Sequence, residues 1–313
     1  MGKRAIPLVW LLVAAGLALV IAGCDRSGLA PVDSTPASAG GPRFEVVSAE
    51  NFWGSLAAQL AGSRAEVHSV IVNPGTDPHS YQPTAQDARR FAGANVAIVN
   101  GVGYDEWATQ LLDASSASGR VVLNVGRLLG LSEGANPHRW YFPHDVAGVI
   151  DSIVADYDRL DPSDTGYFAQ RKQMLLSTGL ARYEQLLREI RARYAGVPVG
   201  YSESIFQGLG EYLDLKLATP YSFAKAIAEG TDVTARDKQA VDAQVQGRKI
   251  AVWVFNTQNV TPDVQRVNQI AREEHIPIAT ITETLTPASA SFQQWQVEQL
   301  EGLARALHEA TGR

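Results

Sequence analysis

One histidine of this sequence stands in a loop with little conformational freedom. His79 lies in the stretch Asn73–Thr84, NPGTDPHSYQPT, which contains three prolines and one glycine. Proline fixes a backbone angle, so an imidazole in such a loop loses little freedom when it binds a ligand. The loop follows the apolar stretch 67–72, which we predict to be a strand, and ligands of open α/β sheets bind beyond the carboxyl ends of strands. His79 is therefore the first candidate binding residue; the alternative is a surface loop whose histidine binds nothing.

The composition limits the chemistry that the rest of the chain offers. Cys24 is the only cysteine, which excludes an internal disulfide and a thiolate metal site elsewhere in the chain. The formal net charge is -6, and there is no basic cluster beyond Lys3-Arg4, so a nucleic acid is not expected as a partner. With 313 residues, 45% hydrophobic and 19% charged, the chain can bury a full core in one or two domains.

Two groups of alternating strands and helices predict an α/β fold. Strand-like stretches followed by stretches of helical period indicate parallel βα units. In the first group we expect helices at residues 51–60, 84–91 and 106–113 and strands at 43–49, 67–72, 96–100 and 121–124. In the second group we expect helices at 207–213, 234–246, 261–274 and 291–310 and strands at 197–201, 216–218, 250–255 and 278–281. The groups predict an N-terminal βα lobe, residues 43–161, and a C-terminal βα lobe, residues 196–313.

A long amphipathic helix is expected between the two lobes. Residues 165–194 contain nothing that breaks a helix except Gly179, and at 1.5 Å per residue they would extend roughly 45 Å. Apolar residues repeat at spacings of four and three and fall on one face: Leu176, Leu180, Tyr183, Leu187, Ile190 and Tyr194. We interpret residues 162–195 as one spine helix that joins the lobes; the alternative is an amphipathic helix inside a single α/β domain.

The N-terminal residues resemble a bacterial lipoprotein signal. Leu8–Ile21 is apolar, and the sequence Ile21-Ala22-Gly23-Cys24 resembles a lipobox. The resemblance implies that residues 1–23 are removed and that a lipid on Cys24 anchors the protein at the extracytoplasmic face of the cell membrane. Residues 24–42, rich in Ser, Ala, Gly and Pro, are interpreted as a flexible tether. The alternative is an ordinary signal peptide or signal anchor with a chance cysteine.

The loop around His79 resembles the signature of a known family. N-P-G-x-D-P-H-x-Y-x-P-T is the signature loop of the periplasmic or lipid-anchored receptors of zinc and manganese ABC importers. Asn100–Trp107, NGVGYDEW, is similar to a second motif of that family, and its GxG does not indicate a phosphate site because a third glycine is missing. The resemblance implies two similar βα lobes with parallel sheets, one long spine helix and a metal site in the cleft between the lobes. It also implies a small rocking of the lobes on binding rather than a wide hinge closure.

The resemblance further implies four metal ligands, two from each lobe: His79, His138, Glu203 and Glu283. His138 lies in the sequence NPHRWYFP, which departs from the family form H-x-W-L-D-P because Phe142 stands where Asp is usual. This departure leaves open which group orients His138, since a ligating histidine normally donates its other N–H to an acceptor. His144 is a competing candidate for the same ligand position.

The acidic candidates bear on the choice of metal. Glu203 stands where zinc receptors carry histidine and many manganese receptors carry Glu, and Glu283 stands where the family carries the shorter Asp. Asn256 replaces a residue that is often Glu, and we interpret it as lying beside the ligands or at the rim of the site. The other histidines are interpreted as packing, helix-end or solvated residues: His68, His275 and His308.

Two neutral imidazoles and two carboxylates neutralise one divalent ion. Such a set suits Mn²⁺, Zn²⁺ or Fe²⁺ and argues against Cu(I). Affinity alone favours zinc, whereas carboxylates that chelate through both oxygens favour manganese. The presence of two carboxylates and the lack of a His-rich loop favour manganese.

The expected function is that of a solute-binding receptor, not an enzyme. A monomer would capture Mn²⁺ or Zn²⁺ and deliver it to an ABC permease and its ATPase. One alternative is a receptor for a metal chelate such as a siderophore. The other is a surface zinc metalloenzyme, which would need an open coordination position and a general base; the sequence has no H-E-x-x-H motif.

Overall fold

The computed structural model describes residues 44–313. The expected signal peptide, the lipid attachment site Cys24 and the tether lie outside the described residues. None of the helices within residues 44–313 has the length and apolarity needed to cross a bilayer.

The first lobe is built on a four-stranded parallel sheet with the strand order β2-β1-β3-β4. Its strands are β1 (Phe44–Glu50), β2 (Ala65–Ile71), β3 (Val96–Val99) and β4 (Val121–Asn124). Its helices are α1 (Asn51–Ala61), α2 (Ala85–Gly93), α3 (Glu106–Ala114), α4 (Val125–Leu128) and α5 (Pro143–Leu160). The strands fall inside the range predicted for the N-terminal lobe.

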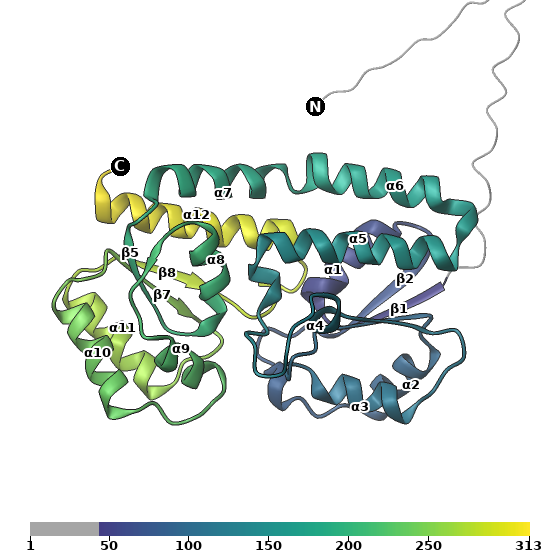
Figure 1. Ribbon diagram of the computed structural model, residues 1–313, viewed down its shortest axis with the longest axis horizontal. Coiled ribbons are helices and arrows are strands. Elements are labelled where there is room, and N and C mark those ends of the chain that lie inside the picture. The colour runs from purple at the N-terminus through teal and green to yellow at the C-terminus, as the bar shows by residue number, and fades with distance from the viewer. Residues whose placement is uncertain (1–43) are drawn as a thin grey trace, which may run out of the picture. The chain divides into compact units, whose positions relative to one another are not determined.

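The second lobe repeats this arrangement with a parallel sheet of order β6-β5-β7-β8. Its strands are β5 (Pro198–Tyr201), β6 (Lys216–Leu217), β7 (Val252–Asn256) and β8 (Ile278–Ile281). Its helices are α8 (Gln207–Tyr212), α9 (Tyr221–Ala228), α10 (Ala235–Gln246), α11 (Pro262–Glu273) and α12 (Phe292–Thr311). The prediction of two similar βα lobes with parallel sheets is confirmed (Figure 1).

The spine is not one uninterrupted α-helix. α6 (Thr165–Met174) and α7 (Ala181–Tyr194) are separated by a π-helical turn over Leu175–Gly179, where the Leu180 N–H donates to the Leu175 carbonyl over 2.7 Å. A π turn adds one residue to the helical repeat and rotates the following residues. Leu175 is therefore buried, whereas Leu176, which we expected on the inward face, is 39% exposed. The other residues predicted to face inward are buried: Leu180, Tyr183, Leu187, Ile190 and Tyr194.

Two further helices pack along the spine. Figure 1 shows α5 beside α6 and α12 beside α7, and both pairs are in contact. α5 was not assigned from the sequence, although Pro143 occupies its first position and it buries Val149, Ile153 and Tyr157 at helical spacing.

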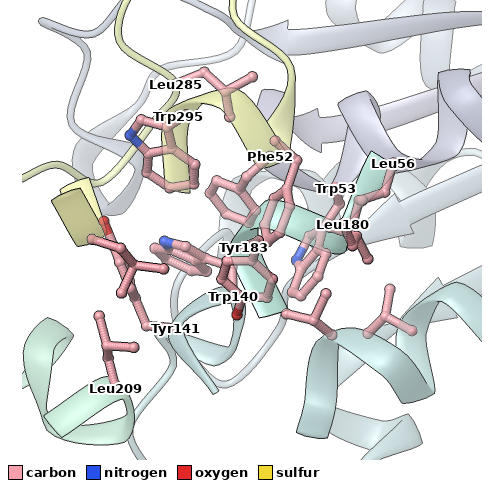
Figure 2. Close-up of a cluster of buried hydrophobic side chains, with 14 of the residues drawn as sticks. Phe52, Trp53, Leu56, Trp140, Tyr141, Leu180, Tyr183, Leu209, Leu285 and Trp295 are labelled. Carbon is pink, nitrogen blue, oxygen red and sulfur yellow. The ribbon is translucent and has the colours of Figure 1, made fainter. Parts of the chain in front are cut away.

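One apolar core extends through both lobes. Phe52 of α1 stacks on Trp140 with 3.9 Å between ring centroids, and Trp295 of α12 and Leu209 of α8 belong to the same buried cluster (Figure 2). Because this surface is shared, a wide separation of the lobes would expose apolar side chains to water. The core therefore holds the facing ends of the two sheets close together.

The π turn predicts different contributions to stability from two adjacent leucines, the buried Leu175 and the exposed Leu176. Leu175→Ala should lower the free energy of unfolding by about 2–5 kcal/mol because it removes a buried side chain, whereas Leu176→Ala should lower it by less than about 1 kcal/mol. Urea unfolding followed by circular dichroism measures both. A larger loss at Leu176 would indicate the straight helix that the sequence pattern alone predicts.

Candidate metal centre

Three of the four predicted ligand residues meet at one point. Parallel pairing places the ends of β5, β7 and β8 side by side, so Glu203, which follows β5, and Glu283, which follows β8, lie close together. His138 comes from the loop before the short 3-10 helix Arg139–Tyr141 of the first lobe. One side-chain ligand atom of each residue lies within 4.8 Å of those of the other two.

The imidazole of His138 faces both carboxylates. Its Nε2 atom lies 3.7 Å from Glu203 Oε1 and 3.6 Å from Glu283 Oε2. The His138 side chain is fully buried, and Nε2 has no hydrogen-bond partner within residues 44–313. Burial, with the nearby charges of His79 and Arg139, lowers the pKa of His138 well below its usual value, so the imidazole stays neutral at physiological pH. A buried neutral imidazole nitrogen facing two acids is a donor set suited to a divalent cation.

The two carboxyl groups are costly to ionise together. Burial raises the pKa of Glu203 to about 7. Burial and the adjacent charge of Glu203 raise the pKa of Glu283 well above its usual value. Without a cation the pair therefore retains protons that an exposed carboxyl would lose, and a bound divalent ion would remove this cost.

Asn256 links the two carboxylates. Its Nδ2 donates to Glu203 Oε2 and to Glu283 Oε1, in each case over 2.8 Å. The prediction placed Asn256 beside the ligands or at the rim, and the structure places it beside them, with its side chain buried. The remaining oxygens, Glu203 Oε1 and Glu283 Oε2, are those that face His138.

Two residues that the sequence analysis did not single out also hold Glu283. The Tyr104 hydroxyl donates to Glu283 Oε2 over 3.0 Å. Gln258 Oε1 accepts the backbone N–H groups of Glu283, over 2.6 Å, and of Thr284, over 3.1 Å. Tyr104 belongs to the motif Asn100–Trp107 and Gln258 lies two residues after Asn256, but nothing in their spacing indicated contact with Glu283.

His79 stands at the rim of the same site. The loop residues Pro74–Ser80 line a cavity of about 610 Å³ together with the three clustered residues. The His79 side chain is exposed, and its ring lies 4.7 Å from the Tyr104 ring, centroid to centroid. Asp77 holds this loop by accepting the His79 N–H over 2.9 Å and the Ser80 hydroxyl over 2.9 Å. The structure thus places His79 in the cavity wall but not within the compact group of three.

The structure shows which group stands in for the aspartate that Phe142 replaces as a partner of His138. The guanidinium carbon of Arg139 lies 3.5 Å from the centroid of the Phe142 ring. The same ring packs against Gly208, where an added Cβ would be 2.3 Å from a ring carbon. Asn136 supplies the missing acceptor instead, because its Oδ1 lies 2.8 Å from His138 Nδ1.

The competing candidate His144, and also His68, lie outside this cluster. His144 packs against Tyr212, with ring centroids 5.2 Å apart, and lines a different cavity. His68 lies in the middle of β2, where its Nε2 is 3.7 Å from a Glu45 and 3.5 Å from a Glu66 carboxylate oxygen.

Comparison with known proteins finds that this chain is similar to metal-binding and metal-uptake proteins. A family model described as the periplasmic component A of the zinc-uptake complex, ZnuA, matches residues 46–306. The manganese-binding lipoprotein MntA of Halalkalibacterium halodurans is 28% identical over 163 residues, about half of each protein: 51% of this chain and 52% of MntA. The iron-binding protein YfeA of Yersinia pestis is 23% identical over 285 residues, 88% of this chain and 81% of YfeA. The solved structure of the periplasmic zinc-binding protein TroA from Treponema pallidum shares the fold, with a TM-score of 0.69, 16% identity, and coverage of 85% of this chain and 99% of TroA.

The raised pKa of Glu203 predicts a pH-dependent cost to stability. As pH rises from about 4.5 to about 7, the unfolded chain releases the Glu203 proton while the folded protein keeps it, so the metal-free protein loses stability through this window. Glu203→Gln removes this cost and should raise the free energy of unfolding at pH 8 by up to about 3 kcal/mol, and by much less at pH 5.

Unfolding of chelator-treated protein at the two pH values measures the effect. Glu298→Gln, an exposed position on α12, is the control and should change little at either pH. Equal gains for Glu203→Gln at pH 5 and pH 8 would show that this carboxyl does not titrate in the window.

Proposed function

Because this chain belongs to the family of the periplasmic zinc-uptake component, ZnuA, we propose that it is a receptor that captures one divalent transition metal ion for an ABC importer. The metal is the cargo, which the receptor would deliver to a permease driven by its ATPase. A lipid on Cys24 would hold the monomeric receptor at the extracytoplasmic face of the cell membrane. The role is one of binding, and we assign no residue a catalytic part.

One observation carries this proposal. A buried imidazole nitrogen without a partner among the described residues faces two carboxylate oxygens at 3.6 and 3.7 Å, and these groups come from both lobes. A cation placed among them would satisfy the nitrogen and neutralise both acids. We assign His138, Glu203 and Glu283 as the inner ligands.

His79 is proposed as the fourth ligand. It is exposed on a loop that its own prolines and Asp77 stiffen, and it lines the cavity into which the other three residues face. A cation bound at the inner three residues would still have an open side toward this loop. A small movement of the loop or of the lobes would bring the His79 imidazole to it.

The donor set restricts the cargo to a few ions. No thiolate is available, and two imidazoles with two carboxylates suit Mn²⁺, Zn²⁺ or Fe²⁺. The number of carboxylates favours manganese. Asn256 occupies one oxygen of each carboxylate, and single-oxygen coordination favours the four-coordinate geometry of zinc. We therefore propose Mn²⁺ or Zn²⁺ as cargo, and competition between the two ions decides between them.

The size of the cavity supports one second candidate. A volume of about 610 Å³ is far larger than a bare ion requires, and it would accommodate a metal bound to a small chelator such as a siderophore. A receptor of this second kind would bind the chelate more tightly than the free ion.

Metal titration tests the ligand assignment. The metal-free protein should bind one Mn²⁺ or Zn²⁺ ion per chain, and Glu203→Ala or His79→Ala should weaken binding at least about tenfold because each removes a ligand atom, equal to about 1.4 kcal/mol or more. Isothermal calorimetry and competition with a fluorescent chelator give the affinities, and elemental analysis of protein purified without chelator identifies the bound metal.

His144→Ala is the matched control because His144 lies close in sequence to His138 but lines another cavity. Its affinity should equal that of the unchanged protein. Wild-type affinity in both the Glu203 and the His79 variants would rule out the proposed site.

A further inference from the structure

The side chain of Asn136 joins the two halves of the proposed metal site. Asn136 lies in the loop between α4 and the short helix Arg139–Tyr141 of the first lobe. Its Oδ1 accepts the backbone N–H of His138 over 3.0 Å and lies 2.8 Å from His138 Nδ1. Its Nδ2 donates to the carbonyl of Ser204 over 2.7 Å and lies 3.2 Å from Gln207 Oε1. Ser204 follows Glu203, so one amide contacts the neighbourhood of a ligand in each lobe.

The partners of Asn136 determine which way its amide points. A backbone carbonyl can only accept a hydrogen bond, so the group beside the Ser204 oxygen must be the Asn136 NH₂. A backbone N–H can only donate, so the group beside the backbone nitrogen of His138 must be the Asn136 oxygen. These two contacts fix the orientation from opposite sides.

This orientation decides where the proton of His138 resides. The Asn136 oxygen cannot donate, so the contact with His138 Nδ1 is a hydrogen bond only if Nδ1 carries the proton. A neutral imidazole has one N–H, and Nε2 then carries the free lone pair. Nε2 is the buried atom that faces Glu203 and Glu283 and has no hydrogen-bond partner in the described part of the chain.

We infer that Asn136 is a positioning residue for metal capture: its amide, held by the Ser204 carbonyl of the second lobe, keeps the His138 proton on Nδ1 and directs the Nε2 lone pair at the cation. This inference rests on the proposed function for the identity of the ligand. Asn136 performs this role without a charge. An aspartate at this position could also accept a hydrogen bond from Nδ1–H, but it would lose the donor to Ser204 and add a negative charge beside the site.

Close packing of the second lobe makes this contact possible. Gly208, in the first turn of α8, lies directly against the Phe142 ring, where a Cβ would be 2.3 Å from a ring carbon. The absence of a side chain lets α8 approach the loop that carries Asn136 and His138. Gln207 and Ser204, which receive the Asn136 amide, lie at the start of α8 and in the turn before it.

The histidine tautomer can be measured in the metal-free protein. With ¹⁵N-labelled histidine, NMR at neutral pH should show His138 protonated on Nδ1 and unprotonated on Nε2; His138→Gln identifies its signals among the six histidines. Asn136→Ala removes the acceptor and should give a mixture of tautomers or the opposite one. The same variant should bind Mn²⁺ or Zn²⁺ about 10–100-fold more weakly.

Two further variants separate orientation from a general effect on structure. Asn136→Asp retains an acceptor for Nδ1 and should retain the wild-type tautomer. Asn95→Leu is the matched control, because Asn95 also accepts a backbone N–H, that of Glu45, but lies outside the cavity. It should leave both the tautomer and the metal affinity unchanged.

The outcomes distinguish this inference from the proposed function. A wild-type tautomer and wild-type affinity in Asn136→Ala would overturn the inference, as would loss of the tautomer in Asn136→Asp. A tautomer that depends on Asn136 in a protein that binds neither Mn²⁺ nor Zn²⁺ would support the orientation of His138 by Asn136 and refute the proposed function.

Discussion

The site depends on two buried carboxyl groups that lie close together in the wall of one cavity. Glu203 is 1% exposed and Glu283 is 8% exposed; burial raises the pKa of both, and the charge of Glu203 raises that of Glu283 further. Hydrogen bonds from Asn256 and Tyr104 offset part of this cost but add no positive charge. His138 cannot supply the charge either, because burial favours its neutral form. A divalent cation would neutralise both acids and use the imidazole nitrogen, which has no partner among residues 44–313.

The scaffold keeps these groups together by sharing one apolar core between the lobes. Trp140 lies two residues after His138 and stacks on Phe52, so the core and the proposed metal site meet at this turn. Trp295 and Tyr141 extend the same cluster toward α12 and the loop after β8, where the Trp295 indole donates to Thr282. A wide opening of the cleft would expose this surface at about 25 cal/mol per Å². The arrangement therefore favours small movements around a largely formed site.

Neutral amides surround the proposed inner ligands. Asn136 holds His138, Asn256 bridges the carboxylates, and Gln258 holds the backbone of Glu283. With two carboxylates and a divalent ion the charges balance, and an acid in place of Asn256 would leave a net negative charge. At position 142 a neutral residue also replaces an acid, because this chain has Phe142 where the family carries Asp. The Phe142 ring packs on Gly208, and the polar contact to His138 comes from the amide of Asn136.

Local patterns in the sequence predicted most elements of the fold but missed α4, α5 and α9. Period-two and helical spacings reflect which side chains of a strand or helix face the core, and they predicted both sets of strands and most helices to within a few residues. The motifs around His79, His138, Glu203 and Glu283 predicted the residues that line the cavity. Tertiary structure alone decided which side chains orient the candidate ligands. Asn136 contacts Ser204 across 68 positions and Tyr104 contacts Glu283 across 179, and no local spacing encodes such pairs. The inward position of Leu175 instead of Leu176 was also decided by packing, because a π turn changes the register of a helix whose apolar residues fit an ordinary repeat equally well.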